Sequence, residues 1–262
     1  MSVNTSSSFI DSAREIREKI GGEYELLAGF FDSFARDADW QKLQELENTY
    51  LTVQPEKLSE PTFMDSDEPD RFFMMVSWFV NKYRILHSLG LQSAEPCRIL
   101  DLGSGPGHFL ALAKFAGHEA VGLDREDPFF SEMSEFLNVE RKEAEIAPNT
   151  PLPNLGQFDL VSAQNIAFHI NSEEERCWNE EEWIFFLRDL SENCLNDNGR
   201  ILLQFKKEAP LKDGLSLEDK SLPRFMRRMG AHFLEDDSGL GVTYFAVFTE
   251  LDKLRQKLMM FG

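Results

Sequence analysis

The stretch Arg98–Asp124, RILDLGSGPGHFLALAKFAGHEAVGLD, decides the fold of this chain. It contains a short apolar run, a group of glycines, a segment with helical spacing, a second short apolar run and a final acid. This order predicts a strand, a tight turn, a helix and a second strand. Glycines in such a turn allow positive φ and let a ligand approach the backbone without meeting a Cβ. The stretch therefore predicts a ligand-binding turn that leads into a helix N-terminus.

Three glycines follow the first predicted strand at alternate positions, Gly103, Gly105 and Gly107, just after Asp101. A dinucleotide-binding turn has its third glycine where this chain has His108. The spacing therefore does not fit a ligand that contains a pyrophosphate. A tight connection without any ligand is the alternative reading of the glycines alone, and Asp101 has the alternative role of ordering the loop.

Two further positions point to an adenosine. Asp124 ends the second predicted strand about 20 residues after the glycine turn, where a carboxylate accepts hydrogen bonds from ribose hydroxyls. The third predicted strand brings Glu143 and Ala144 to the same edge of the sheet. An acid there accepts a hydrogen bond from an adenine amino group, while apolar neighbours pack on the ring. These residues predict an adenosine ligand without a pyrophosphate.

Short apolar runs alternate with helical segments from Cys97 onward, which is typical of a mainly parallel sheet covered by helices. The clearest helix begins with a capping box of Asn179 and Glu182, and Gly199 is predicted to end it. The predicted strands are RILDL, EAVGLD, VERKEAEI, FDLVSAQ, RILLQF, AHFLEDD and TYFAVFTE.

The chain before Cys97 is helical and rich in aromatic residues. Helical spacing runs up to about Leu51 and again from residue 71, with Gly90 as the predicted stop. The Pro- and acid-rich stretch between them predicts a connecting loop. We therefore divide the chain into an N-terminal helical cap or lid with its linker, residues 1–70, and a sheet domain, residues 71–262. The aromatic stripes favour packing, with part of the segment forming a lid.

Composition excludes several classes of protein. The chain has 262 residues, of which 42% are hydrophobic, enough for a full core. Its 46 acidic and 27 basic residues give a net charge of −19, which repels phosphate backbones and anionic lipids. Nucleic acid and membrane partners are therefore not expected. The three cysteines form no CxxC pair, so neither a zinc site nor a disulfide framework is expected, and the cytoplasm fits best.

Several segments together resemble the class I S-adenosylmethionine-dependent methyltransferases. Their motifs are similar to those of small bacterial type-11-like members of that family. ILDLGSGPGHF is similar to the first motif of the family, Asp124 to its ribose-binding acid, and KEAEI and FDLVSAQNIAFHI to its third- and fourth-strand segments. LNDNGRILLQF resembles the fifth-strand segment. The resemblance covers residues 97–208 well, the last two strands loosely and the first seventy residues not at all. It implies an α/β, Rossmann-like fold with a seven-stranded, mainly parallel sheet in the order 3-2-1-4-5-7-6.

The resemblance also implies S-adenosylmethionine as the cofactor and in-line transfer of its methyl group to a small-molecule acceptor. An arginine at position 84 would pair with the cofactor carboxylate. A solvated helix face is the alternative reading of Tyr83 and Arg84. The predicted cofactor contacts are Tyr83, Arg84, Asp101, Gly103, Ser104, Gly105, Gly107, Asp124, Arg125, Glu143, Ala144 and Gln164.

His169 follows the fourth predicted strand, where acceptors of the family bind, and is the candidate general base. A structural histidine is the alternative, because the sequence shows no partner for it. The expected acceptor is a small, neutral or cationic, partly apolar metabolite. Two other functions remain open. One is a protein that binds the cofactor without chemistry, and the other is transfer of a different group, such as aminopropyl, from an adenosylmethionine derivative.

Overall fold

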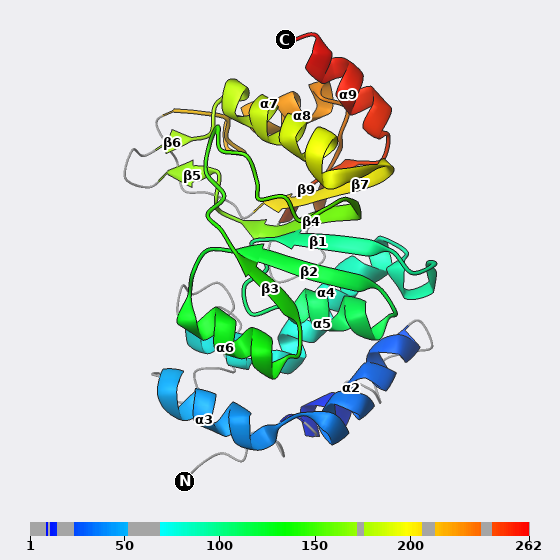
Figure 1. Ribbon diagram of the computed structural model, residues 1–262, viewed down its shortest axis with the longest axis vertical. Coiled ribbons are helices and arrows are strands. Elements are labelled where there is room, and N and C mark those ends of the chain that lie inside the picture. The colour runs from blue at the N-terminus through cyan, green and yellow to red at the C-terminus, as the bar shows by residue number, and fades with distance from the viewer. Residues whose placement is uncertain are drawn as a thin grey trace. The chain divides into compact units, whose positions relative to one another are not determined.

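The structure is a computed structural model that describes residues 9, 11–14, 24–51, 69–171, 176–205, 213–236 and 243–261 (Figure 1). Contacts divide the chain into two compact units. The first unit consists of Met1–Pro96, Gly105–Ala120 and Asp127–Arg141, and the second of Cys97–Ser104, Val121–Glu126 and Lys142–Gly262. Most of the predicted connecting loop lies outside the described residues. A separate cap formed by residues 1–70 therefore stays a prediction.

The seven predicted strands form one sheet in the order β3-β2-β1-β4-β7-β9-β8 (Figure 1). Numbered along the chain, this order is 3-2-1-4-5-7-6, so the predicted topology is confirmed. β4 is parallel to both β1 and β7, whereas β9 is antiparallel to both of its neighbours. The strands are β1 (Arg98–Leu102), β2 (Glu119–Asp124), β3 (Glu140–Glu143), β4 (Phe158–Ile166), β7 (Leu195–Phe205), β8 (His232–Asp236) and β9 (Thr243–Phe248).

The central strands are buried on both faces, which is why they appear in the sequence as continuous apolar runs. Leu160, Val161 and Ala163 of β4 are fully buried. The register pairs Leu102, the last residue of β1, with Ala163 of β4. The order of the sheet reverses between these two strands, and in open α/β sheets ligands bind beside the carboxyl ends of the strands at this place.

The helices of the second unit are α7 (Glu180–Asp189), α8 (Ser221–Arg228) and α9 (Leu251–Met259). α7 begins with the predicted capping box: the Asn179 side chain accepts a hydrogen bond from the Glu182 backbone N–H at 3.0 Å, and the Asn179 N–H donates to Glu182 Oε2 at 2.8 Å. Glu182 also pairs with Arg176 at 2.8 Å. The short strands β5 (Ile170–Asn171) and β6 (Arg176–Cys177) form a separate antiparallel pair.

The predicted end of the α7 helix at Gly199 is wrong. The helix continues as a π-helical turn, Leu190–Cys194, and β7 begins directly after it. Leu195 pairs with Phe158 and Arg200 with Leu160, so the residues between them form an irregularity inside the strand. A Cβ on Gly199 would lie 2.7 Å from Leu195 Cδ2. Glycine is required here by close packing, not by a helix terminus.

The first unit is helical and packs through aromatic rings. The Phe30 ring of α2 lies 4.6 Å from the Phe79 ring of α4 and 5.5 Å from the Phe115 ring of α5, centroid to centroid. The expected packing role of these aromatic stripes is confirmed. Gly90 follows α4 with φ of 72°, as expected for a helix stop. The helices are α2 (Glu25–Asp37), α3 (Trp40–Tyr50), η4 (Pro69–Phe73), α4 (Met75–Ser88), η5 (Leu91–Ser93), α5 (His108–Phe115) and α6 (Pro128–Phe136).

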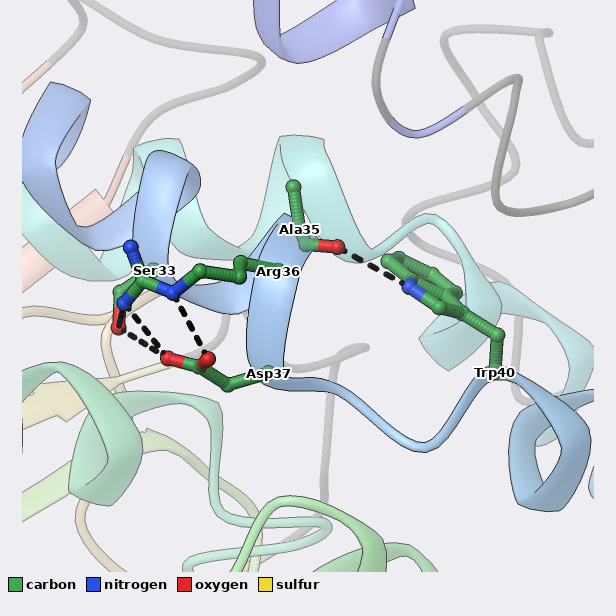
Figure 2. A network of polar contacts seen from close by, with 5 residues as sticks. All are labelled: Ser33, Ala35, Arg36, Asp37 and Trp40. Atoms are coloured by element: carbon green, nitrogen blue, oxygen red, sulfur yellow. Dashed lines mark hydrogen bonds and ion pairs between the residues drawn. The ribbon is translucent and has the colours of Figure 1, made fainter.

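The corner between α2 and α3 is closed by side chains (Figure 2). The indole N–H of Trp40 donates to the carbonyl of Ala35 at 3.2 Å, which satisfies one of the carbonyls left without an intrahelical partner at the end of α2. Arg36 and Asp37 form an exposed ion pair at 2.8 Å, and Ser33 donates to the same carboxylate at 2.9 Å. Exposed ion pairs contribute little to stability, so the indole bond is the more important contact.

Within the described ranges, no helix is both long and apolar enough to cross a membrane.

Candidate ligand-binding site

Two backbone hydrogen bonds join the ends of the first three strands in the second unit. The N–H of Gly103, just after β1, donates to the carbonyl of Leu123 in β2 at 2.8 Å. The N–H of Ala144, just after β3, donates to the carbonyl of Asp124 at 2.9 Å. These bonds bring together three residues that the sequence predicted for the site: Gly103, Asp124 and Ala144.

Asp101 is held by a neighbouring strand. Its Oδ1 accepts a hydrogen bond of 2.5 Å from Ser162 Oγ, and the two residues are register partners in β1 and β4. Both are buried, with 2% and 0% of their surface exposed. A charge-assisted bond at this depth fixes the carboxylate directly below the glycine turn. Ser162 is absent from the predicted site, although a polar residue between the apolar Val161 and Ala163 was a signal for it.

The acid at the end of β2 is oriented by the backbone. Asp124 is half-buried, and its Oδ1 accepts a hydrogen bond of 2.8 Å from the Arg125 N–H. The side chains of Arg125 and Glu143 are exposed at the ends of β2 and β3. Ala144 is half-buried beside them. The arrangement offers a fixed carboxylate and an apolar methyl group at one edge of the sheet.

All three glycines of the turn have positive φ: 67° at Gly103, 54° at Gly105 and 95° at Gly107. A Cβ on Gly103 would meet nothing within 4 Å, so this residue borders open space. A Cβ on Gly107 would lie 2.6 Å from Val139 Cγ2, so this glycine is required by packing. Ser104 Oγ is buried and has no hydrogen-bond partner among the described residues. Buried hydroxyls are normally satisfied, so this oxygen is a candidate ligand contact.

The end of β4 is irregular. Gln164 is buried, with 5% of its surface exposed, whereas Asn165 is exposed and has φ of 55°. The pairing with β7 shifts register between Ala163 and Ile166, so Asn165 lies in a β-bulge. Bulges next to functional sites redirect side chains, and sparsely populated backbone conformations gather there. Asn165 was not named individually from the sequence, because a bulge inside an apolar strand leaves no periodicity signal.

His169 lies in the core of the second unit. It is fully buried and packs against the rings of Trp183 and Phe205, with both centroid distances 5.6 Å. Neither ring nitrogen has a hydrogen-bond partner among the described residues, and the same holds for the indole nitrogen of Trp183. Burial lowers the pKa of His169 to about 4, so the imidazole is neutral at pH 7.

Tyr83 and Arg84 lie on α4 in the first unit. The Tyr83 ring is buried against Tyr24 and His87, at 5.3 and 6.0 Å between centroids. Arg84, the next residue, is exposed. The role of both in cofactor binding stays a prediction.

His108 occupies the position of the third glycine in a dinucleotide-binding turn. It starts α5 and is buried, and its ring stacks on Trp78 at 5.7 Å. Burial, and then the charge of Lys82, lower its pKa to about 3. A glycine is therefore replaced here by a neutral, tightly packed ring. The described part of the chain contains no group of three or more His, Cys, Asp or Glu side chains placed to hold a metal ion.

Comparison with known proteins gives structural matches only. No protein-family model matches the chain, and no curated protein is significantly similar to it in sequence. Among solved structures, Burkholderia thailandensis 1,6-didemethyltoxoflavin-N1-methyltransferase, with 1,6-didemethyltoxoflavin and S-adenosylhomocysteine bound, is 17% identical at a TM-score of 0.46. That match covers 74% of this chain and 89% of the other.

Two other solved structures match over a similar extent. Human N-acetylserotonin methyltransferase in complex with S-adenosylmethionine is 14% identical at a TM-score of 0.43, covering 84% of this chain and 69% of the other. A TehB-like S-adenosylmethionine-dependent methyltransferase from Corynebacterium glutamicum is 17% identical at a TM-score of 0.41. That match covers 66% of this chain and 96% of the other. At these identities and scores the matches assign no ligand to this chain. The sheet order establishes the Rossmann-like topology on its own.

Proposed function

We propose that this chain is an S-adenosylmethionine-dependent methyltransferase that acts on a small molecule. The observation that carries the proposal is the pair of backbone bonds, Gly103 to Leu123 and Ala144 to Asp124, which join the glycine turn to the two positions expected to contact an adenosine. They lie at the strand ends where open α/β sheets bind ligands.

Each residue at the strand ends has a proposed role. Asp124, whose carboxylate is oriented by the Arg125 N–H, accepts hydrogen bonds from the ribose hydroxyls. Glu143 accepts from the adenine amino group, and Ala144 packs on the ring. Ser104 and Gly103 contact the rest of the cofactor, because a buried hydroxyl without a described partner and an open Cβ position suit a ligand lying on the turn.

The residues at the turn favour this cofactor over a dinucleotide. A pyrophosphate needs a third glycine so that the helix start can approach it closely, and this chain has the buried ring of His108 there. S-adenosylmethionine contains a ribose and an adenine but no pyrophosphate. When bound, it supplies a methyl group that is activated by a positively charged sulfur.

The protein then has to orient the acceptor and exclude water, which is the main contribution of a binding site to a group transfer. We assign this role to the end of β4, where Gln164 is buried and Asn165 is exposed in the bulge. His169 remains the candidate base. Its complete burial and its lowered pKa, about 4, support the structural alternative more strongly.

The proposed acceptor is a small, neutral or cationic, partly apolar metabolite, because a net charge of −19 disfavours nucleic acids and other polyanions. We also keep the cytoplasm as the proposed location, since the sequence has only three cysteines and no CxxC pair.

The direct test uses cofactor labelled in the methyl group, incubated with the purified protein and a metabolite extract. A labelled small-molecule product that Asp124→Ala strongly reduces is the expected result. Cofactor binding without any labelled product would favour a non-catalytic binding protein. A product formed only from the decarboxylated cofactor would favour aminopropyl transfer. Efficient labelling of added RNA or DNA would overturn the acceptor class.

A further inference from the structure

Gln204 of β7 and Leu234 of β8 lie on the same face of the sheet in the second unit. Side chains alternate between the two faces along a strand. Leu203 and Phe205 belong to the buried apolar cluster on one face, so Gln204 between them lies on the other. Leu234 also lies on this other face, because its neighbour Phe233 packs against the apolar cluster.

Gln204 stands opposite the bulge of β4. The strand β7 pairs with Ala163 before the bulge and with Ile166 after it. Gln164 and Asn165 therefore both lie opposite Gln204. The two glutamines are buried, with 5% and 7% of their surface exposed. Three carboxamides thus occupy adjacent positions where β4 and β7 end.

The side-chain oxygen of Gln204, Oε1, is buried and accepts no hydrogen bond from any residue that the structure describes. Buried polar atoms are normally satisfied, and one without a partner lowers stability. A ligand that donates an N–H or O–H to Oε1 would remove this cost. The oxygen therefore indicates a ligand contact rather than a role in the fold.

The same face changes from buried and polar to exposed and apolar across the next two strands. Gln204 pairs with Phe245 of β9, and Phe245 pairs with Leu234 of β8. Phe245 is half-buried, whereas Leu234, on the last strand in the order of the sheet, is 56% exposed. Neighbouring strands are about 4.8 Å apart, so this row spans about 10 Å. A ligand whose apolar part lies on Phe245 and Leu234 would bring a polar end to Gln204.

The chemistry of a carboxamide specifies that polar end. A carboxamide has an acceptor beside its donors and no charge, so it matches a neutral group with the same arrangement, as glutamine matches the edge of adenine. We propose that Gln204 recognises the methyl acceptor, and that the acceptor carries an amide-type group, free or within a planar nitrogen heterocycle. Its apolar part lies on Phe245 and Leu234. This inference rests on the proposed function and narrows the acceptor to the neutral class.

The test uses aromatic probes that differ in their polar end. Benzamide has a neutral donor beside an acceptor, benzoate is charged and has no donor, and acetophenone has an acceptor only. Biphenyl-4-carboxamide adds an apolar ring to benzamide. NMR titration of the full chain in the presence of S-adenosylhomocysteine measures the dissociation constants at pH 8 for the wild type, Gln204→Leu and Leu234→Ser. Gln256→Leu, at an exposed glutamine of α9, is the matched control.

We expect the wild type to bind benzamide at least about tenfold more tightly than benzoate or acetophenone, the effect of a hydrogen bond in a buried site. Gln204→Leu should lose this preference and keep its affinity for S-adenosylhomocysteine within about twofold. It should melt no lower than the wild type, because it removes a buried oxygen that has no described partner. Leu234→Ser should weaken binding of biphenyl-4-carboxamide but not of benzamide. Gln256→Leu should change none of these constants.

Several results would overturn the inference. These are a wild type that binds no probe or binds benzoate as well as benzamide, and a preference for benzamide that persists in Gln204→Leu. A clear fall in the melting temperature of Gln204→Leu would show that the fold itself satisfies Oε1, and unchanged binding of biphenyl-4-carboxamide by Leu234→Ser would remove Leu234 from the site. Failure of the wild type to bind S-adenosylhomocysteine would instead reject the proposed function, and the same titrations without that ligand would still decide the role of Gln204.

Discussion

Ser162 donates a hydrogen bond of 2.5 Å to Asp101 across the two strands between which the order of the sheet reverses. Both side chains are buried, so removing the donor leaves a carboxylate oxygen without this bond in a region of low polarity. We expect Ser162→Ala to lower the free energy of unfolding by about 1.5–3 kcal/mol, as for bonds to charged groups.

Urea unfolding measures this loss. Ser134→Ala is the matched control, because Ser134 is also buried but donates to a neutral acceptor, the carbonyl of Pro106, at 3.2 Å. The control should lose about 1 kcal/mol or less. Equal losses in the two variants would contradict a charge-assisted bond at Asp101.

Gly107 is expected to tolerate substitution worse than Gly117. Both have nearly the same φ, 95° and 96°, so alanine costs about 1–2 kcal/mol of backbone strain at either position. Only at Gly107 does the new Cβ meet a neighbour, Val139 Cγ2 at 2.6 Å. Gly107→Ala should therefore destabilise the protein clearly more than Gly117→Ala in thermal unfolding. Equal melting temperatures would show that Val139 moves aside without cost.

Stability should fall in acid partly because of His169. The folded state keeps its pKa near 4, whereas an unfolded histidine titrates near 6.5, so between these values only the unfolded state binds the proton. The free energy of unfolding should therefore be unaffected by this group above about pH 6.5 and decrease by up to about 1.4 kcal/mol per pH unit below it.

His169→Phe should reduce this pH dependence, measured by urea unfolding at pH 7, 6 and 5, and the remainder should come from His108, whose pKa is also lowered by burial. His232→Gln, at an exposed position of β8, controls for the loss of a histidine. An unchanged slope in His169→Phe would contradict the burial of a neutral imidazole. A large loss of methyl transfer at pH 8 with unchanged stability would restore His169 as the base.

Substitution of Asn165 tests the proposal that the end of β4 orients the methyl acceptor. Asn165→Gly removes the carboxamide but keeps the positive φ available, so the fold and the affinity for S-adenosylhomocysteine should be retained. Transfer of labelled methyl should decrease about tenfold to a hundredfold if the side chain orients the acceptor. Asn149→Gly has the same φ of 55° and is also exposed, and it should leave transfer unchanged. Full transfer by Asn165→Gly would remove this residue from the acceptor site.

The sequence predicted what local spacing determines. The glycine turn, the acid of β2 and the seven alternating strands follow from short-range patterns, whereas the order of the sheet was expected from the resemblance to a known family. Asn179 and Glu182 likewise form the predicted capping box because its geometry is set within one helical turn.

What the sequence did not predict depends on contacts between distant segments. Gly199 appeared to end a helix because it follows a turn-like NDN, but pairing of Leu195 with Phe158 draws those residues into β7. The packing of Phe72 on Gly105 and the bulge at Asn165 are likewise set by neighbours far away along the chain. Periodicity within one segment contains no information on such contacts.

The central claim is that this chain binds an adenosyl cofactor at the ends of β1–β3. Calorimetry with S-adenosylhomocysteine and NAD on the wild type and Asp124→Ala tests it most directly, with Glu126→Ala, an exposed carboxylate two residues later, as control. We predict that the wild type and Glu126→Ala bind S-adenosylhomocysteine and not NAD, and that Asp124→Ala binds about tenfold to a hundredfold more weakly while remaining folded. Tight binding of NAD with no response to S-adenosylhomocysteine would contradict the claim.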